Sequence, residues 1–384
     1  MANVLIEEQY LSNIGSAIRN KNGSTTSYRI CDMADAINAF IKTSFSADDV
    51  AGKLIFGTIS CSTSYIARGG FEGYPNLTSV DFPVCADIGF GAFSNCQTLT
   101  TISFPACTNI GSSAFFWCFS LTAANFPECV SIGSYAFSGC NNLVTISFPK
   151  CTSIGDGAFE YCSKLTSANF PECTSINSYA FSPCSALRSI SFPKCLSIGG
   201  HAFGSCGIIS INSVNFPVCK NIGSGAFRSC QALRSVDFPM CTIIGSYAFQ
   251  SCKSLSIVNI PNCTSISNSA FGSCFSLYSV NFPVCTNIGS SAFYTCYSLL
   301  TASFPVCKSI GSYAFASCRK LISLYLTNVS SVPVLGTNAF SSTPIGGYST
   351  YAGNFGSVFV PTSLYNSFIT ATNWASISSR IVSV

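Results

Sequence analysis

Residues 143–162 read LVTISFPKCTSIGDGAFEYC, and close copies of this stretch recur along most of the chain. Its two cysteines belong to two tracks that each advance by 22 residues and are offset from each other by 11. The first track is Cys85, Cys107, Cys129, Cys151, Cys173, Cys195 and then Cys219, Cys241, Cys263, Cys285, Cys307; the second is Cys96, Cys118, Cys140, Cys162, Cys184, Cys206 and then Cys230, Cys252, Cys274, Cys296, Cys318. A fixed period of this size is the signature of a solenoid, in which identical turns stack on one another. We call each repeat a rung.

Each part of the rung predicts a local structure. Residues 143–148 alternate apolar and small polar side chains, which is typical of a short strand with one buried face. Pro149 ends that strand, and proline holds this place in all 11 rungs. Gly155 is expected to supply a positive φ for a turn. The spacing of the apolar residues in 157–162 favours a short helical or 3₁₀ turn.

The cysteines allow two interpretations. Ladders of disulfides are sterically feasible, because neighbouring rungs lie about 4.8 Å apart. However, each rung has enough apolar side chains to form a core without disulfides, and free cysteine behaves as a small buried hydrophobic residue. We therefore expect two rows of buried free thiols. The chain has no C-x-x-C spacing, so no zinc site and no other metal site is expected.

Composition narrows the class of protein further. Only 8% of the residues are charged and the net charge is +4, so no electrostatic footprint for nucleic acid is present. Mean hydropathy is high at +0.43, yet no apolar run approaches the roughly 18 residues of a membrane-spanning helix. The start of the chain lacks the pattern of a secretory signal.

The consensus L-x-x-I-x-F-P-x-C-x-x-I-G-x-x-A-F-x-x-C resembles the BspA-like leucine-rich repeat over residues 54–345. The resemblance implies a right-handed β-solenoid with short strands and helical or 3₁₀ turns. It also implies surface adhesion with no catalytic motif. The first cysteine departs from the family, which commonly has a branched aliphatic residue there, and this favours a buried, apolar role for the thiol.

Both ends differ from the repeats. Residues 1–46 have helical spacing on either side of a loop, and they resemble a short module at the front of phage tail-associated proteins; a simple amphipathic cap over the first rung is the alternative. Residues 346–384 contain a strand that ends in Pro361 and then a helix with Trp374, so they are expected to cap the last rung.

The sequence offers little for catalysis. The one histidine, His201, occupies a slot that holds tyrosine in other rungs, and no serine lies in a G-x-S-x-G motif. Phosphate-binding loops are absent from the sequence as well. We expect a non-enzymatic protein without a cofactor.

Binding residues are expected at outward positions that stack with the 22-residue period. The strongest candidates follow the second cysteine directly, where two aromatic residues lie between two cations. An early aromatic cluster and the outward polar rows of the strands add further candidates. They are Lys253, Phe275, Tyr297 and Arg319; Phe116, Trp117 and Phe119; and Asn125, Asn169, Asn215 and Asp237. The two-residue insertion between Cys206 and Cys219 is another place where a binding loop could lie.

These observations predict a recognition or adhesion protein that binds a glycan or protein on a host cell surface. A phage tail-associated receptor-binding protein or a gut-bacterial surface protein fits best, located on a virion or at a cell surface. Residues 1–46 would serve self-association or attachment to a larger assembly. A structural spacer without a specific ligand is the alternative.

Overall fold

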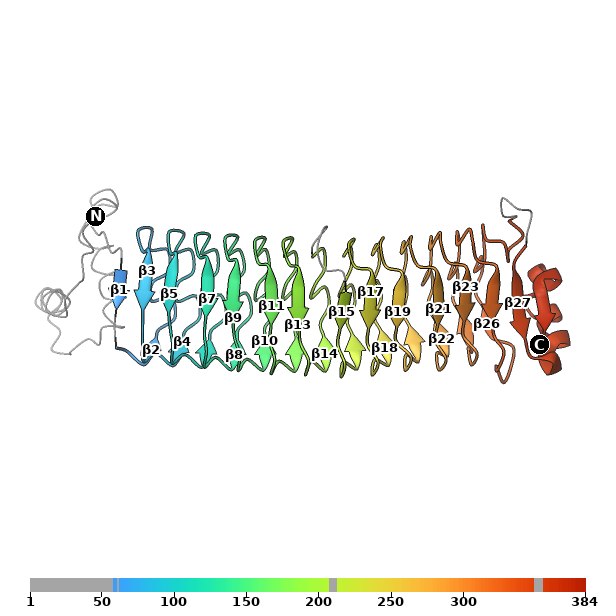
Figure 1. Ribbon diagram of the computed structural model, residues 1–384, viewed down its shortest axis with the longest axis horizontal. Helices are drawn as coiled ribbons and strands as arrows, with labels where there is room; N and C mark the ends of the chain where they lie inside the picture. Colours follow the sequence, from blue (N-terminus) through green and yellow to red (C-terminus); the bar gives the residue numbers. More distant parts are fainter. Residues whose placement is uncertain (1–57, 61, 207–212, 349–354) are drawn as a thin grey trace, which may run out of the picture. The chain divides into compact units, whose positions relative to one another are not determined.

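The computed structural model describes residues 58–60, 62–206, 213–348 and 355–384 (Figure 1). The chain is a parallel β-solenoid of the leucine-rich-repeat type with about 14 turns, little helix and a small C-terminal helical cap. It divides into two compact units, Met1–Cys173 and Thr174–Val384. The expected N-terminal helices and the insertion after Cys206 lie outside the described residues.

In the first unit, strands of three residues alternate along the chain with strands of two. The longer strands are β1 (Thr58–Ser60), β3 (Ser79–Asp81), β5 (Thr101–Ser103), β7 (Ala123–Asn125), β9 (Thr145–Ser147) and β11 (Ser167–Asn169). The shorter strands are β2 (Tyr65–Ile66), β4 (Asp87–Ile88), β6 (Asn109–Ile110), β8 (Ser131–Ile132) and β10 (Ser153–Ile154), and they pair in that order.

The second unit repeats this arrangement. Its longer strands are β13 (Ser189–Ser191), β15 (Ser213–Asn215), β17 (Ser235–Asp237), β19 (Ile257–Asn259), β21 (Ser279–Asn281), β23 (Thr301–Ser303) and β25 (Ser323–Tyr325). Its shorter strands, again in spatial order, are β12 (Ser175–Ile176), β14 (Ser197–Ile198), β16 (Asn221–Ile222), β18 (Ile243–Ile244), β20 (Ser265–Ile266), β22 (Asn287–Ile288), β24 (Ser309–Ile310) and β26 (Val334–Leu335).

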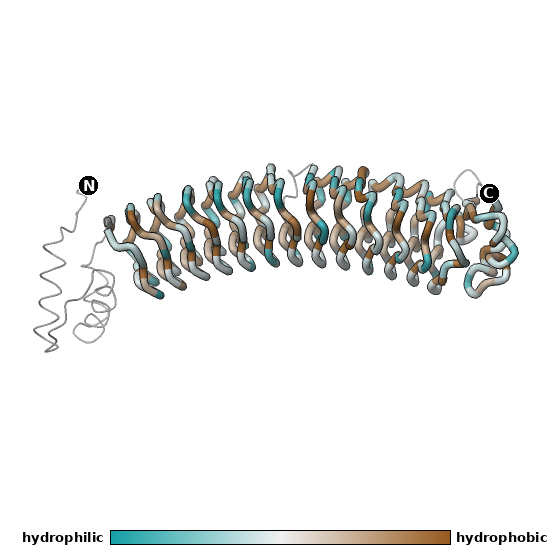
Figure 2. Tube along the Cα trace, turned by 90° about the horizontal axis from the view of Figure 1, so that it is seen from below, coloured by the Kyte–Doolittle hydropathy of each residue, from teal (hydrophilic) through white to brown (hydrophobic). Residues whose placement is uncertain are grey.

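The strands pair in parallel and in register, so equivalent residues of successive rungs lie above one another; Val214, for example, pairs with Val236, and Val236 with Val258. Apolar and polar segments alternate along every rung (Figure 2). The alternation places one set of side chains inside the coil and leaves the other outside, as expected for strands with one buried face.

Phenylalanine forms two stacked columns in the core. The rings of Phe82 and Phe104 are 5.4 Å apart and nearly parallel, and Phe93 meets Phe104 edge-on at 5.9 Å. Such aromatic pairs contribute about 0.5–1.5 kcal/mol each beyond the burial of their surface. The columns therefore fix the register of the rungs as well as stabilising them.

The two cysteine tracks are rows of buried free thiols, as predicted; all 22 of these cysteines are free. A first-track thiol donates within its own rung, from Cys107 Sγ to the carbonyl of Asn109 at 3.3 Å. A second-track thiol donates to the preceding rung, from Cys118 Sγ to the carbonyl of Phe93 at 3.1 Å. Burial raises the pKa of Cys96 to about 12, which keeps this thiol protonated and unreactive at neutral pH.

The expected helical or 3₁₀ turn within each rung is wrong. The stretch after the glycine is a series of turns in which two positions have positive φ, such as Ser113 at 56° and Trp117 at 58°. Every second amide bonds to the next rung, as from Phe93 N to Ala114 O at 2.7 Å, while the amides between them close turns within the rung, as from Ala114 N to Gly111 O at 3.2 Å. A continuous helix would use the first set of donors internally as well, so the stacking of rungs excludes it.

The repeated Ile-Gly glycine has a different reason from the one expected. Gly133 does not have a positive φ. Instead, a Cβ at this position would lie 2.5 Å from the amide nitrogen of Ser112 and 2.7 Å from the carbonyl carbon of Gly111. Glycine is favoured here because the backbones of adjacent rungs approach closely. Ser267 fills the slot once, and its bond to Ile244 O is 3.0 Å, against 2.8 Å for Gly133 to Ile110 O.

The cap closes the last rung as predicted. It consists of β27 (Ser357–Val360), η1 (Thr362–Leu364), α4 (Tyr365–Thr370), η2 (Ala375–Arg380) and β28 (Ile381–Ser383). The Trp374 side chain is fully buried, contacts Phe340 at 6.1 Å between ring centroids and donates from Nε1 to Pro333 O at 2.8 Å. It thereby covers the open end of one phenylalanine column.

Candidate binding surfaces

Four residues of the second unit form a continuous stack, which we call the cation–aromatic column: Lys253, Phe275, Tyr297 and Arg319. The rings of Phe275 and Tyr297 are 5.0 Å apart at 21°. Lys253 Nζ lies 5.8 Å from the Phe275 ring centroid, and Arg319 Cζ lies 5.2 Å from that of Tyr297. The structure thus brings together all four residues that the sequence predicted for this position.

Local structure explains why these side chains face outward. Each follows a second-track cysteine whose side chain points inward, and Leu277 turns back into the core two residues after Phe275. The turns are tied to each other by main-chain bonds, such as Ser276 N to Lys253 O at 3.1 Å. The column is therefore held on a rigid edge of the coil.

The column carries positive charge that no described acidic residue neutralises. Neither Lys253 nor Arg319 forms an ion pair with any described residue. Tyr297 is 38% exposed and Phe275 is half-buried, so the rings offer an edge and part of a face to solvent. Exposed rings between two cations suit an acidic partner that also presents apolar surface.

The predicted cluster in the first unit is also assembled. The Trp117 ring stacks on Phe116 at 5.1 Å and on Phe119 at 5.9 Å, and 46% of Trp117 is exposed. The same ring covers the backbone of Gly139, where a Cβ would lie closer than contact distance. This cluster therefore also has a packing role between rungs.

The polar row is assembled only in part. Asn215 and Asp237 are neighbours on the paired strands β15 and β17. Asn125 on β7 and Asn169 on β11 are not neighbours, because β9 lies between these strands and has Ser147 at this position. Asp237 is half-buried and its Oδ1 accepts a hydrogen bond from Asn259 Nδ2 at 2.7 Å. Asp237 therefore has a structural partner, while the three asparagines are exposed.

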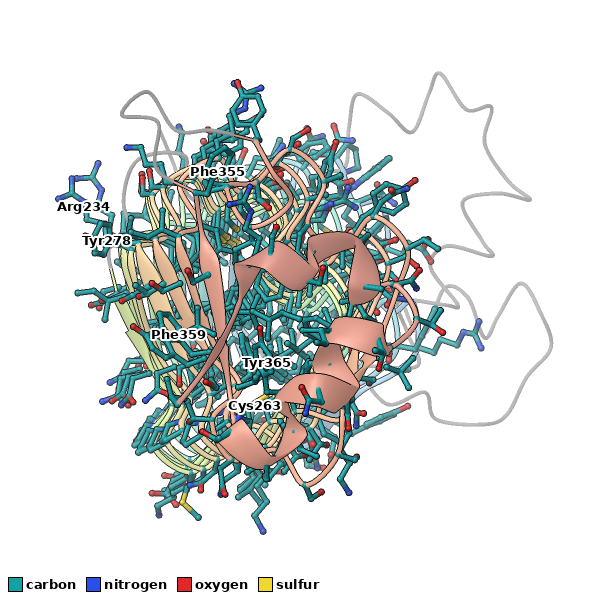
Figure 3. The ribbon with its side chains drawn as sticks, turned by 90° about the vertical axis from the view of Figure 1, so that its right-hand side faces the viewer. Arg234, Cys263, Tyr278, Phe355, Phe359 and Tyr365 are labelled. Atoms are coloured by element: carbon teal, nitrogen blue, oxygen red, sulfur yellow. The ribbon has the colours of Figure 1, made fainter. Side chains whose placement is uncertain are left out.

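Some exposed aromatic residues were not predicted. Tyr278 is 56% exposed and projects outward near Arg234 in the end-on view (Figure 3). Tyr325 stacks on Phe359 of the cap at 4.8 Å, because β25 pairs with β27. The period indicates where Tyr278 lies, but no repeat links Tyr325 to Phe359, which is 34 residues later.

His201 does not lie in a catalytic arrangement. Its ring stacks on Tyr179 at 5.1 Å and 5°, in the slot that tyrosine fills in other rungs. Partial burial and the nearby Arg228 lower its pKa. Among the described residues, no group of three His, Cys, Asp or Glu side chains is placed to hold a metal ion. Nor does the described part contain a helix with the length and apolar character needed to cross a membrane.

Comparison with known proteins supports the repeat assignment. A family model for the BspA type leucine rich repeat region matches residues 64–174, 108–234 and 220–346. No curated protein matches the chain. A leucine-rich repeat protein from Bacteroides ovatus has a similar structure, with 21% identity, a TM-score of 0.59 and coverage of 85% of this chain and 92% of that one.

Two further structures are similar at lower scores. A leucine rich cell surface protein from Faecalibacterium prausnitzii is 22% identical, with a TM-score of 0.43 and coverage of 80% of this chain and 82% of that one. A leucine-rich repeat protein from Eubacterium ventriosum is 19% identical, with a TM-score of 0.46 and coverage of 75% and 82%.

Proposed function

The chain belongs to the BspA type leucine-rich repeat family, and on that premise we propose that it is a non-catalytic recognition protein acting at a cell surface. Its ligand is a glycan or protein on a host cell. The observation that carries the proposal is the cation–aromatic column, in which two stacked rings lie between two cations that no described acidic residue neutralises.

The column suits a ligand with both apolar faces and negative charge. The C–H face of a sugar ring, or an aromatic or proline side chain, packs against Phe275 and Tyr297. A carboxylate or sulfate of the same ligand pairs with Lys253 or Arg319, since guanidinium and ammonium groups bind such anions. Acidic glycans and acidic peptide segments of host surface proteins are therefore the two ligand classes to test first.

A paired substitution tests this proposal without disturbing the fold. Serine stands at the position of Phe275 and Tyr297 in two other rungs, at Ser163 and Ser185, so the double variant F275S/Y297S keeps a side chain that the coil already accepts. We expect it to lose at least about tenfold in binding to an array of acidic glycans or to fixed host cells, since buried aromatic contacts dominate interface energies.

The matched control is Y135S/Y161S in the first unit. Both tyrosines are exposed, at 42% and 54%, and serine fills their slots elsewhere, at Ser113 and Ser205. Retained binding in F275S/Y297S, or equal losses in the two double variants, would sink the proposed role of the column. Absence of binding by the wild-type protein to every probe would favour the alternative, a structural spacer.

Attachment through residues 1–46 is the second part of the proposal. These residues resemble the front module of phage tail-associated proteins, which favours association with a larger assembly. Deleting them should abolish self-association or incorporation into that assembly while leaving the thermal unfolding of the solenoid unchanged. If deletion only lowers stability, the segment is a cap.

A further inference from the structure

Three main-chain donors of the last rung have no partner among the described residues. In the rung before it, Tyr313 N, Phe315 N and Ser317 N donate to the carbonyls of Thr337, Ala339 and Ser341 at 3.1, 2.9 and 2.8 Å. The equivalent donors of the last rung are the amides of Asn338, Phe340 and Ser342. None of these three amides has an acceptor among the described residues.

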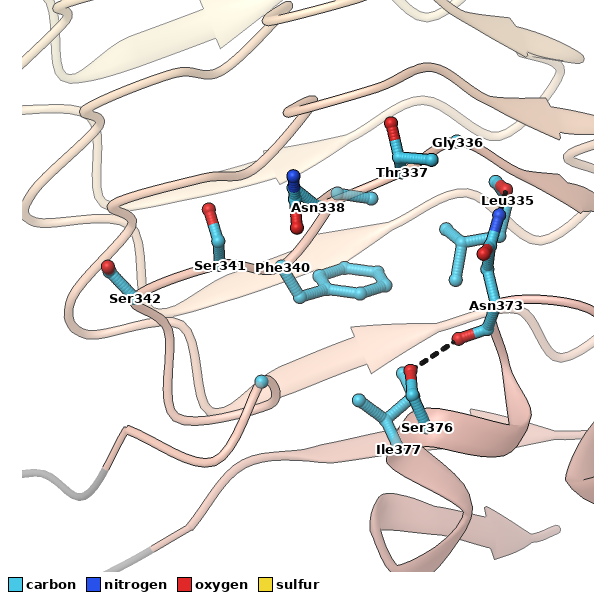
Figure 4. A pocket seen from close by; sticks show the side chains of 12 residues that line it. Leu335, Gly336, Thr337, Asn338, Phe340, Ser341, Ser342, Asn373, Ser376 and Ile377 are labelled. Carbon is cyan, nitrogen blue, oxygen red and sulfur yellow. Dashed lines mark hydrogen bonds between the residues drawn. The ribbon is translucent and has the colours of Figure 1, made fainter.

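A cavity lies where the next rung would be. Its volume is about 520 Å³. One wall is the last rung, including Asn338, Phe340 and Ser342; the opposite wall is the cap, through Asn373, Ser376 and Ile377 (Figure 4). Because each rung directs these amides toward the following rung, the three free donors face this cavity.

The cap wall is fixed in place. Asn373 Nδ2 donates to Leu335 O at 2.6 Å, and Ser376 Oγ donates to Asn373 O at 2.7 Å. Trp374 occupies the position above Phe340 that the next phenylalanine of the column would take. The cap therefore replaces the apolar half of a further rung and leaves its hydrogen-bonding half unfilled.

The preceding rungs show what fits such a row of donors. At the rung interfaces within each unit, these donors pair with carbonyls on alternate residues of a second segment, and the middle carbonyl belongs to an alanine, such as Ala314 or Ala339. That alanine is buried, so there is no room for a larger side chain at this point. The required partner is a polypeptide with a small residue between two outward-facing ones.

We propose that this cavity binds a peptide segment of a partner protein, which adds one more half-rung to the coil through its main chain. Three carbonyls on alternate residues accept from Asn338, Phe340 and Ser342, and alanine, glycine or serine occupies the middle position. Recognition of this kind extends an open edge of the fold, so the main chain supplies affinity and the small pocket supplies specificity.

The first test uses the protein without a ligand and asks whether the three amides lack acceptors. In hydrogen–deuterium exchange followed by NMR, the amides of Asn338, Phe340 and Ser342 should exchange far faster than those of Tyr313, Phe315 and Ser317, their bonded counterparts. The probe is an acetylated, amidated peptide of sequence SSASST at millimolar concentration, compared with SSLSST. The alanine peptide should shift the three amide resonances and slow their exchange about tenfold; the leucine peptide should do neither.

A proline variant removes one donor of the row. Pro183 occupies the equivalent slot in another rung, but proline cannot adopt the φ of 55° that Ser342 has, so S342P is compared with the wild type once thermal unfolding shows that its fold is intact. S342P should weaken binding of the alanine peptide at least about fivefold, whereas S341A, which removes only a hydroxyl that lines the cavity, should bind within about twofold of the wild type.

Three outcomes would overturn the proposal. In the first, the three amides are protected in the free protein or do not respond to the peptide. In the second, the two peptides bind with equal affinity, or the two variants bind the alanine peptide equally, which would show that the cavity does not recognise a peptide through its main chain and its small middle residue. In the third, sedimentation shows concentration-dependent self-association that S342P abolishes, which would make a second copy of this chain the occupant.

Discussion

Raising the pH should unfold this protein, at a pH set by its buried thiols. Burial raises the pKa of 14 described cysteines above its usual range, for example to about 12 for Cys140 and Cys252. The 14 are Cys96, Cys107, Cys118, Cys129, Cys140, Cys151, Cys162, Cys219, Cys230, Cys241, Cys252, Cys274, Cys307 and Cys318. In the unfolded chain a cysteine thiol has a pKa of about 8.5. Between these values the folded state holds more protons than the unfolded state. Stability is thus complete below about pH 8.5 and is lost as the pH rises toward the folded pKa.

The magnitude follows from the number of thiols. At pH 10, ionisation of one cysteine in the unfolded chain favours unfolding by between about 1 and 2 kcal/mol. For these 14 thiols the effect is on the order of 20 kcal/mol. This reaches the lower end of the stability expected for 384 residues, about 19–58 kcal/mol at about 0.05–0.15 kcal/mol per residue. We therefore expect a steep transition between about pH 10 and 11.

The assay follows far-UV circular dichroism and thiolate absorbance together, after equilibration at each pH in the presence of reductant. The two signals should change in the same narrow interval, because the thiols ionise only as the coil opens. Native dichroism that persists beyond about pH 11.5, or thiolate absorbance that rises while the dichroism stays native, would refute the reasoning. The second result would show that the thiols titrate in the folded protein.

Three other perturbations follow from the same structure. G133A should lower the free energy of unfolding by about 2 kcal/mol in denaturant, because its Cβ meets the backbone of the preceding rung. The control G91S should be nearly neutral, since serine already holds the equivalent positive-φ position at Ser113. Equal unfolding midpoints for the two variants would contradict this explanation of the glycine. F104A removes a ring stacked between Phe82 and Phe126 and should cost about 3–5 kcal/mol by the same measurement, and a loss below about 1 kcal/mol would mean that the column does not stabilise the coil. At neutral pH, a thiol-specific reagent should leave the 22 buried cysteines of the described residues unmodified in the folded protein. After unfolding without reductant it should modify close to all 24 cysteines, and a shortfall by pairs would indicate disulfides.

The inward columns were predictable because the period alone places equivalent residues above one another. The same reasoning found the cation–aromatic column, since Phe275 and Tyr297 are one period apart. It failed for the turn that contains Phe93, whose spacing suits a helix equally well. The choice between turn and helix depends on where the Phe93 amide finds its acceptor, and that acceptor lies in the next rung at Ala114.

The glycine and the cavity show two further limits of sequence reasoning. The motif Ile-Gly is compatible with a positive φ and with a close backbone approach, and only the distance between Gly133 and Ser112 decides between them. The cavity beside Ser342 depends on how the cap docks on the last rung, and no repeat describes that contact. Periodicity therefore predicts the contacts that recur from rung to rung, whereas the contacts at the ends of the coil follow only from the structure.

The departure of the first cysteine from the family pattern has a physical reason. A branched aliphatic residue fills an inward column equally well, but it has no hydrogen-bond donor. Cys107 fills the column and also donates to the carbonyl of Asn109, and Cys285 does the same for Asn287 at 3.4 Å. Each bond is weak, yet each helps to hold the outward residue of a two-residue strand, a strand too short to be held firmly by its own ladder. Because those outward residues form a polar row along the two-residue strands, the first thiol track ties the core of the coil to its surface.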